Sequence, residues 1–577
     1  MRRACCVLAI AGVGFVLDCS NAKGGSPTGG LNGGTGSSAG SGGSGGSGIA
    51  NSAGTAGLLL NFDAGLFDGA TETPTGQEGT RLPRPAFPKM PILGQGAPSN
   101  AAALFAGASG AESAAPCISD PGPDAMYPGN WLRPRVSFKP TGAENLFEFT
   151  LSTPQEPNEL VVYTTNTWWT MPRDMWQRLT NSNDLQKVEI NVRGGVFDGG
   201  TLTGVTARAT QSFYIAPMQA DAGGSILYAG GSSDSAADNG ALKGFLVGDE
   251  SVEVVLTTAN VNAKQPQAIG GVFGYFAGGP DGKFVSAIIG NGNTPWKSWL
   301  ASIEKGSEGI EPAFVTAGGR DALRSMALDE VSLAAFSPAR WNKGEHVEIL
   351  SGSNGELRWV LLDAPGSGAG VAYGTLARDG DPKAGNPSLP NLAWSHDGEH
   401  VLYPSSNSNA SESDLYVVPY NDGKGGMATP LSGAAEPDWN EYYPDFSADD
   451  RFVIFSRSHA GGTETAVVPA TGGKATPLRT HETSTCVTAD ADLSPRFSPF
   501  VKTVAGTTYY WFTFSSLRFV NTPQLYLGAL TVTAGSTAVQ SYGAVHLWNL
   551  PEDEASFGAV WTDLNIPNAP DPEVPPR

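Results

Sequence analysis

Apolar and polar residues alternate over short stretches through much of the chain, and two of these stretches are copies of each other. In residues 391–403, apolar positions around Trp394 precede an Asp397-Gly398 pair, and a second apolar run follows. This order predicts a strand, a tight turn and another strand. The same order returns in residues 443–455, and each copy is followed by a third strand and a short fourth strand. We therefore predict a repeat of four strands.

The repeat has a regular step along the chain. The first strand of each unit carries an aromatic anchor, and the anchors are Phe336, Trp394, Phe446 and Phe497. They recur about every 50–60 residues, and a fixed step with four strands in it is the signature of a β-propeller. Asp449 repeats the turn position of Asp397, and a weaker unit carries Asp281-Gly282 at its turn. We predict an all-β protein whose residues 213–566 form a six-bladed propeller.

The last strand-like stretch has no blade of its own. Residues 557–563 follow the outer strands of the sixth unit, and Trp561 resembles the anchor Trp394. We predict that this stretch closes the ring as the innermost strand of the first blade, a role for which residues 213–216 compete. Closure removes unpaired strand edges. Truncation after Pro551 is therefore expected to destabilise the protein.

A smaller β domain precedes the propeller. Residues 125–212 alternate or run apolar at strand length, which predicts a small antiparallel β-sandwich. One helix is predicted at residues 172–179, where Pro172 stands near the start and the apolar residues share a face. Trp168 and Trp169 stand just before this helix. A tryptophan pair can stack on a sugar, but a place in the core is the favoured interpretation.

The beginning of the chain predicts export and a lipid anchor. Residues 1–18 combine a basic start with an apolar run of signal-peptide length. Cys19 follows and resembles the lipidated cysteine of bacterial lipoproteins, although Asp18 stands where a small residue is usual. Ser20 resembles the outer-membrane form of the sorting signal, and plain secretion with cleavage nearby is the alternative. Residues 19–57, rich in Gly and Ser, predict a flexible tether.

Two further segments have little strand pattern. Residues 58–124 are rich in Gly and Pro and are predicted to be mostly irregular, with their later part lying on the folded body. Residues 567–577 form a Pro-rich tail, so truncation after Pro567 is expected to be harmless.

Charge and cysteine content limit the function classes. The net charge of −21 argues against binding of nucleic acid and against electrostatic docking to anionic lipid. Cys117 and Cys486 are the thiols left after Cys19, and in an exported chain they are expected to form a disulfide. No Cys/His cluster has metal-ligand spacing. Asp490 and Asp492 are interpreted as solvated loop residues, with Ca²⁺ binding as the less favoured alternative.

The repeat turns resemble a known family. Residues 279–282, 394–398 and 446–450 match the strand–Ser-Pro-Asp-Gly–strand phrase of TolB-type β-propellers. With the lipoprotein-like start, the resemblance implies a Gram-negative envelope lipoprotein, anchored in the outer membrane and facing the periplasm or the surface. TolB is periplasmic and binds envelope proteins, but its partner-binding residues have no close match here. Some related chains attach haem through Cys-x-x-Cys-His; residues 268–272 lack both residue types, so no haem is expected.

Two functions compete. No nucleophile elbow, phosphate loop or other catalytic motif is recognisable, which favours a non-catalytic module that binds an envelope protein or polysaccharide, with no catalytic residues and no cofactor. The alternative is a carbohydrate-active enzyme, a glycoside hydrolase or lyase with its site at the propeller axis. Two carboxyls facing each other across an aromatic-lined axial pocket would favour the enzyme. A filled axis would favour the binding module.

Overall fold

The computed structural model describes residues 87–564, apart from short gaps. The gaps are 109–113, 182–183, 222, 232–240, 266–271, 292–293, 326–330, 353–354, 366–371, 385–391, 408–411, 461, 484–485, 488–490 and 519–521. Several predictions therefore fall outside the described residues: the signal peptide, Cys19, the tether and the tail. The stretch compared with the haem motif also lies outside them, except for Val272. No helix within the described ranges has the length and apolar character needed to cross a bilayer.

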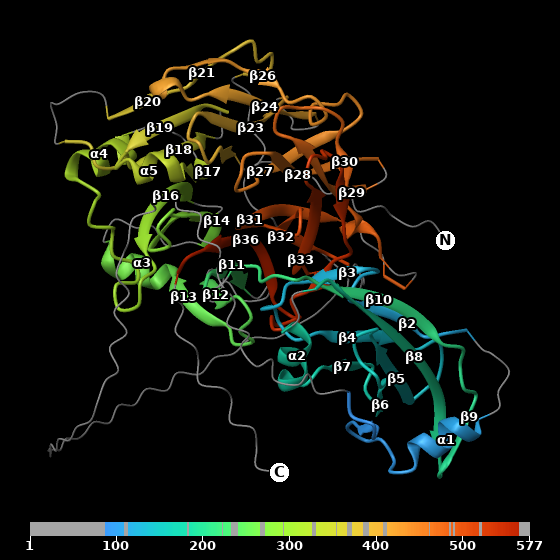
Figure 1. The fold of residues 1–577 in the computed structure, drawn as a ribbon. Helices are drawn as coiled ribbons and strands as arrows, with labels where there is room; N and C mark the ends of the chain where they lie inside the picture. The colour runs from blue at the N-terminus through green and yellow to red at the C-terminus, as the bar shows by residue number, and fades with distance from the viewer. Residues whose placement is uncertain are drawn as a thin grey trace, which may run out of the picture. The chain divides into compact units, whose positions relative to one another are not determined.

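The N-terminal domain is built from two sheets and two helices (Figure 1). The larger sheet has the order β1 (Ile92–Leu93), β6 (Leu160–Thr164), β5 (Leu146–Ser152), β8 (Gln186–Asp198), β10 (Ala209–Ile215) and β3 (Ala125–Tyr127), with β9 (Thr201–Thr203) on β8. The smaller sheet has the order β2 (Cys117–Asp120), β4 (Arg135–Lys139) and β7 (Trp168–Thr170). The helices are α1 (Ala101–Gly107) and α2 (Arg173–Thr180).

Aromatic side chains from the two sheets meet in a shared core. The Phe138 ring on β4 lies 4.8 Å from the Phe147 ring on β5, and Phe149 lies 5.3 Å from Trp169 on β7. Trp169 is thus a core residue, as favoured. Trp168 is 44% exposed, so the core interpretation is wrong for this residue. The predicted helix at 172–179 is confirmed as α2.

The structure corrects three expectations for this domain. The larger sheet is mixed, because β1 pairs with β6 and β3 pairs with β10 in parallel. The domain boundary expected between residues 212 and 213 falls within β10, which pairs with β8 along its whole length. Residues 213–216 are therefore not the inner strand of a blade. Within residues 58–124, β1, α1 and β2 are regular elements, which cover a small part of this segment.

From β11 onward the chain forms a succession of antiparallel sheets. The first is β13 (Glu253–Thr257), β12 (Ala241–Leu246), β11 (Ser225–Gly231) and β36 (Ala555–Thr562), and the second is β14 (Val272–Gly278), β15 (Phe284–Asn291) and β16 (Thr294–Ser302). The third is β17 (Val331–Phe336), β18 (Val347–Gly352), β19 (Leu357–Leu361) and β20 (Tyr373–Thr375). The fourth is β22 (Ala393–Trp394), β23 (His400–Ser406), β24 (Ser413–Pro419) and β26 (Thr429–Pro430).

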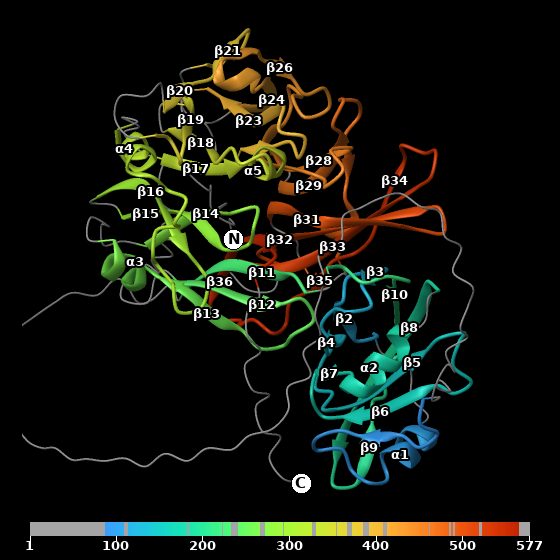
Figure 2. The ribbon, with the colours of Figure 1, turned by 60° about the vertical axis from the view of Figure 1, so that its left-hand side comes forward.

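The later sheets continue the same order. The fifth is β27 (Asn440–Phe446), β28 (Phe452–His459), β29 (Gly462–Pro469) and β30 (Thr476–Pro477). The sixth is β31 (Asp492–Val504), β32 (Thr507–Ser516), β33 (Gln524–Thr533) and β34 (Val539–Ser541), with β35 (Val545–His546) on β33, and its long strands run side by side in Figure 2. The connections hold the paired strands β21 (Ala377–Asp379) and β25 (Gly425–Met427) and the helices α3 (Thr258–Lys264), α4 (Ala317–Ser325), α5 (Pro338–Asn342), η1 (Asn421–Gly423) and η2 (Arg479–His481).

The inner strands of these sheets close a ring. They contact one another in the cyclic order β14, β17, β22, β27, β31 and β36, and β36 contacts β14 again. The predicted closure by the last strand is confirmed, because β36 pairs antiparallel with β11 from Ser225 opposite Thr562 to Gly231 opposite Ala555. A cyclic order of inner strands defines a β-propeller. The number of blades stays a prediction, because several links between sheets fall in the gaps of the description.

The anchor residues occupy equivalent places on the inner strands. All of them are buried: Phe336 on β17, Trp394 on β22, Phe446 on β27, Phe497 on β31 and Trp561 on β36. Each contributes to a hydrophobic cluster of its own part of the ring. The period of the sequence thus reflects a large buried aromatic side chain that recurs on five of the inner strands.

The repeated turn is held by its own side chains. The Ser395 hydroxyl donates to an Asp397 carboxylate oxygen at 2.6 Å and accepts the His400 N–H at 3.0 Å. Asp397 also accepts the Glu399 N–H at 2.9 Å. Gly398 has φ of +79°, and a β-carbon there would lie 2.8 Å from the Ser337 hydroxyl of the preceding sheet. The aspartate thus fixes the turn, and the glycine allows close contact between sheets.

The other copies of the turn show the same bonds. The Ser447 hydroxyl donates to Asp449 at 2.7 Å, and Asp281 accepts the Lys283 N–H at 3.1 Å. Gly282 has φ of +67° and lies against the backbone of Asp563, as Gly398 lies against the third sheet. These residues therefore have structural roles in turns.

Candidate functional site

Three inner strands carry a bulge at the same repeat position. Tyr443, Ser494 and Gly558 each stand three residues before an anchor and have φ of +54°, +52° and +66°. The strand register shifts by one residue at each of these points. A bulge re-aims the neighbouring side chain. A left-handed conformation is uncommon for a bulky residue such as tyrosine, so Tyr443 is held there by its surroundings.

An aromatic cluster, formed by Tyr275, Tyr442, Tyr443 and Phe557, lies between the inner strands β14, β27 and β36. The Phe557 ring lies 6.3 Å from the Tyr275 ring and 6.2 Å from the Tyr443 ring, and Tyr442 and Tyr443 are 5.2 Å apart. Tyr275 is on β14 and Tyr443 is on β27. In the cyclic order of the inner strands, β27 is as far from β14 in one direction as in the other, so the two strands face each other across the ring. The cluster therefore crosses the propeller axis, and we name it the axial cluster.

The axial cluster is aromatic and uncharged. Burial raises the pKa of both Tyr275 and Tyr443 above the ordinary value for tyrosine, so both phenols stay protonated. Tyr443 is only 3% exposed. An axis filled with packed rings is the arrangement expected of the binding module and not of the axial enzyme site. Sequence reasoning missed these residues, because neither the bulge nor the contact across the ring is visible in a single copy of the repeat.

Two glutamates are buried within the strands of the ring. Glu348 on β18 is fully buried, and its Oε1 accepts the Ser286 and Ser298 hydroxyls, the latter at 3.3 Å. Burial raises the pKa of Glu348 to about 7. Glu441 on β27 is also fully buried, and burial raises its pKa to about 8. Both carboxyls prefer to be protonated in the folded protein.

Replacement of Glu348 by glutamine should weaken the pH dependence of stability. The wild-type glutamate contributes its full stability below the ordinary pKa of 4.5 and loses it as pH rises through about 7. One pKa unit corresponds to about 1.4 kcal/mol, so the loss amounts to roughly 3 kcal/mol. We expect the free energy of unfolding to fall from pH 5 to pH 8 in the wild type and to fall less in Glu348→Gln. Denaturant titrations at both pH values measure this.

The matched control is Glu412→Gln, since Glu412 is exposed. This variant should keep the wild-type pH dependence. If the free energy of unfolding changed equally with pH in Glu348→Gln and in the wild type, Glu348 would be ionised at neutral pH in the folded state.

Asp492 corrects the expectation of a solvated loop. It opens β31, its side chain is fully buried, and the Arg518 Nη2 donates to its Oδ1 at 2.6 Å. His481 lies 3.7 Å from its other oxygen. Burial alone would raise the pKa of Asp492, but Arg518 and His481 hold it below its ordinary value. Asp492 is therefore a buried ion-pair residue. Asp490 lies outside the described residues.

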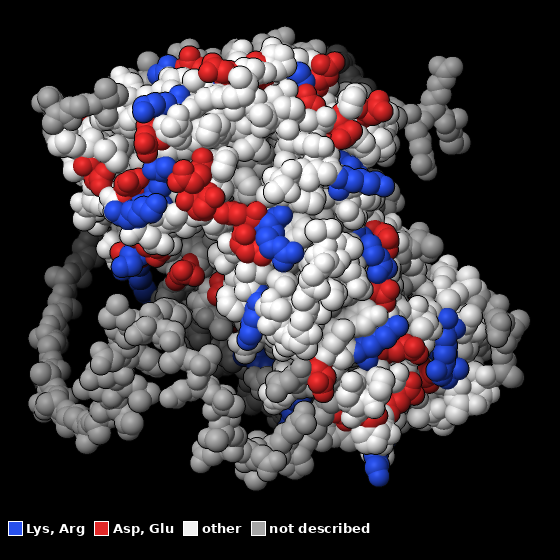
Figure 3. Space-filling view, turned by 45° about the horizontal axis from the view of Figure 1, so that its top comes forward, with Lys and Arg blue, Asp and Glu red and all other residues white. Residues whose placement is uncertain are grey.

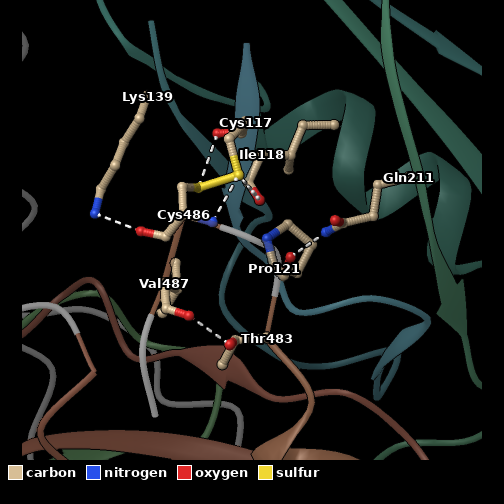
Figure 4. The surroundings of a disulfide bond; sticks show 8 residues. All are labelled: Cys117, Ile118, Pro121, Lys139, Gln211, Thr483, Cys486 and Val487. Atoms are coloured by element: carbon tan, nitrogen blue, oxygen red, sulfur yellow. Dashed lines mark hydrogen bonds between the residues drawn. A yellow bond between two sulfur atoms is a disulfide. The ribbon is translucent and has the colours of Figure 1, made fainter. Parts of the chain in front are cut away.

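A disulfide joins the N-terminal domain to the propeller (Figure 4). Cys117 on β2 and Cys486 before β31 have Sγ atoms 2.13 Å apart and α-carbons 6.0 Å apart. The Lys139 amine on β4 donates to the Cys486 carbonyl at 3.0 Å. The Gln211 amide donates to the Pro121 carbonyl beside them. The two cysteines thus pair as expected, and their bond lies at the junction of the two domains.

Direct hydrogen bonds and ring packing continue the junction beyond the disulfide. The Gly122 N–H donates to the Ala544 carbonyl at 2.7 Å, and the His546 N–H donates to Asp120 at 3.0 Å. Burial raises the pKa of Asp120 to about 7 and lowers the pKa of His546 to about 3, so His546 is neutral. The Trp131 ring lies 5.9 Å from the Trp561 ring of β36. Both domains therefore share one core at this junction.

Charges are mixed on the molecular surface. In Figure 3, basic and acidic side chains lie beside one another and do not separate into regions of one sign. Such a face offers no extended basic track for a phosphate backbone.

Comparisons with known proteins give structural likenesses only. No protein-family model and no curated protein matches the chain. TolB from Acinetobacter baumannii is 13% identical over 65% of this chain and 79% of its own, with a TM-score of 0.35. A TolB structure from Agrobacterium tumefaciens is 15% identical over 59% of this chain and 99% of its own, with a TM-score of 0.32. A nidogen–laminin complex contributes a chain 11% identical over 59% of this chain and 99% of its own, with a TM-score of 0.34. The cyclic order of the inner strands, and not these scores, makes the C-terminal domain a β-propeller.

Proposed function

We propose that this protein is a non-catalytic binding module of the cell envelope, tethered to a membrane by its N-terminus, that recognises a protein partner. The observation that carries the proposal is the axial cluster, because packed rings occupy the place where an axial substrate would have to bind. The sequence adds a secretion-type start and a Gly/Ser-rich tether. Propeller folds host many functions, so the fold itself does not decide between them.

A capture experiment tests the binding function. The chain with a C-terminal affinity tag is expressed with its own signal sequence, and proteins that co-purify from detergent-solubilised envelope are identified by mass spectrometry. We expect one or a few envelope proteins in stoichiometric amounts that survive a salt wash. Glycan hydrolysis or cleavage by the purified protein, with no captured protein, would contradict the proposal.

The membrane tether is tested at Cys19. Replacement of Cys19 by alanine should abolish incorporation of a fatty-acid analogue in cells and release the protein from the membrane fraction. A diacyl chain buries enough methylene groups to hold a folded protein on a bilayer, whereas the unlipidated chain lacks this anchor. Ser26→Ala, a change within the tether, is the control and should still be labelled. Equal labelling of the wild type and Cys19→Ala would exclude lipidation at this residue.

A further inference from the structure

The junction carries an arginine stacked on two tryptophans. The guanidinium carbon of Arg135 on β4 lies 4.6 Å from the centre of the Trp168 ring and 4.1 Å from the centre of the Trp548 ring. Trp168 belongs to β7 and Trp548 follows β35, so both domains contribute. The Trp548 indole N–H donates to the Arg133 carbonyl at 2.9 Å, which fixes this ring. We name this arrangement the arginine clamp.

The guanidinium of the clamp is oriented but incompletely bonded. Its Nε donates to the Thr170 hydroxyl at 2.9 Å, and this is the only hydrogen bond of its head group among the described residues. Neighbouring Arg133 is different, because Glu250 and the Met171 carbonyl take its donors. The Nη atoms of Arg135 therefore keep their donors, in a head group that the two rings hold in place.

Arg135 is unusual in this acidic chain. Thirteen of the arginines with described side chains lie within 4.0 Å of a carboxylate: Arg133, Arg173, Arg178, Arg193, Arg208, Arg320, Arg340, Arg358, Arg378, Arg457, Arg479, Arg496 and Arg518. Arg451 has no such carboxylate but donates to the Tyr510 hydroxyl at 3.4 Å. Glu552 and Asp120 act on Arg135 from a distance and form no ion pair with it. A net charge of −21 offers many potential partners, and among the described carboxylates none lies within bonding distance of Arg135.

An exposed tryptophan stands beside this free donor pair. Trp168 is 44% exposed, and it is the only tryptophan among the exposed large apolar residues of the described chain. Tryptophan and arginine are the residue types that most often dominate protein interfaces, because they combine apolar area with directed hydrogen bonds. A head group that is already ordered loses little entropy when it binds.

We propose that the arginine clamp is a docking site for a carboxylate carried by a protein partner, with an apolar partner side chain on Trp168. This proposal rests on the proposed function and names one place where the partner is held. A planar carboxylate can accept both free Nη donors at once. A protein segment with one carboxylate suits the clamp better than a polyanion, because repeated negative charge would be repelled by this acidic chain.

Selection from a displayed library of random twelve-residue peptides on the immobilised full chain tests this inference. The selected peptides are then synthesised, each also with its acidic residue changed to the amide, and their Kd values are measured. We expect an Asp or Glu next to an apolar residue. We expect Arg135→Gln to weaken binding of the acidic peptides at least tenfold. For this variant, the acidic peptide and its amide form should bind with the same Kd.

Three variants make the test specific. Arg135→Lys keeps the charge but loses the paired donors, and it should also weaken binding. Trp168→Ala changes an exposed side chain, so it keeps the fold and should weaken binding even if Arg135→Gln is unstable. Arg451→Gln removes the other arginine without an ion pair and should leave Kd within about twofold of the wild type.

Four results would overturn the inference. In the first, the selected peptides carry no carboxylate. In the second, their Kd values do not change when Arg135 or Trp168 is replaced. In the third, no peptide is enriched at all. The fourth is binding of oligogalacturonate through Arg135 in place of peptides, which would assign the clamp to a polysaccharide. If the capture experiment still yields an envelope protein, only the location of the site is wrong. If it yields none, the proposed function fails as well.

Discussion

Truncation after Pro551 is expected to produce a protein that aggregates or fails to fold, although the sheets from β14 to β35 keep all their strands. The truncation removes β36, whose eight residues pair with β11 and contact the neighbouring inner strands β14 and β31. Without it, the first sheet exposes an unpaired edge and the ring is open. The expected result is measured by thermal unfolding and by size-exclusion chromatography of the purified variant.

The loss extends beyond strand pairing because β36 also carries core side chains. Trp561 is 7% exposed and packs against Trp131 of the N-terminal domain, and Phe557 belongs to the axial cluster. Removal of a large buried aromatic side chain alone costs about 3–5 kcal/mol. Trp561→Ala should therefore lower the melting temperature strongly even with the strand in place.

Truncation after Pro567 is the matched control. It keeps every described strand, and we expect the wild-type melting temperature. A truncation after Pro551 that melted like the wild type would show that β36 is dispensable for the ring.

Loss of the disulfide is expected to give the second largest effect. Cys117 and Cys486 are separated by 369 residues, so the bond restricts a very long loop of the unfolded chain. In the chain-entropy model a loop of this size corresponds to roughly 6 kcal/mol, just above the range of measured effects. We expect Cys117→Ser, Cys486→Ser and the double variant to lose similar stability, because any of them breaks the same bond.

Reduction of the wild-type protein provides the control for this prediction. A reductant should lower the wild-type melting temperature to that of the double variant and should leave the double variant unchanged. Two free thiols in the denatured, non-reduced wild type would contradict the bond itself. An unchanged melting temperature in the double variant would show that the remaining contacts of the junction, such as Gly122 with Ala544, are sufficient.

The repeat, its turns and its core positions could be predicted from the sequence because each depends on local chemistry. Alternation with a period of two marks strands wherever one face is buried, and the turn sequence around Asp397-Gly398 specifies its own hydrogen bonds. The anchors repeat because five of the inner strands bury a large aromatic side chain at the repeat position. Ring closure was also predicted, from an unassigned strand at the end and a missing inner strand at the start, but only strand pairing excluded the competing residues 213–216.

The tertiary structure decided the features that depend on distant parts of the chain. Strand pairing placed β10 in the first domain, and an ion pair with Arg518 placed Asp492 in the interior. The axial cluster requires a left-handed Tyr443 and a contact across the ring, and neither is encoded in one repeat. The arginine clamp joins Arg135 to Trp548 only because the two domains share a junction. Local sequence determines elements and their faces, whereas packing between elements far apart in the chain determines which side chains meet.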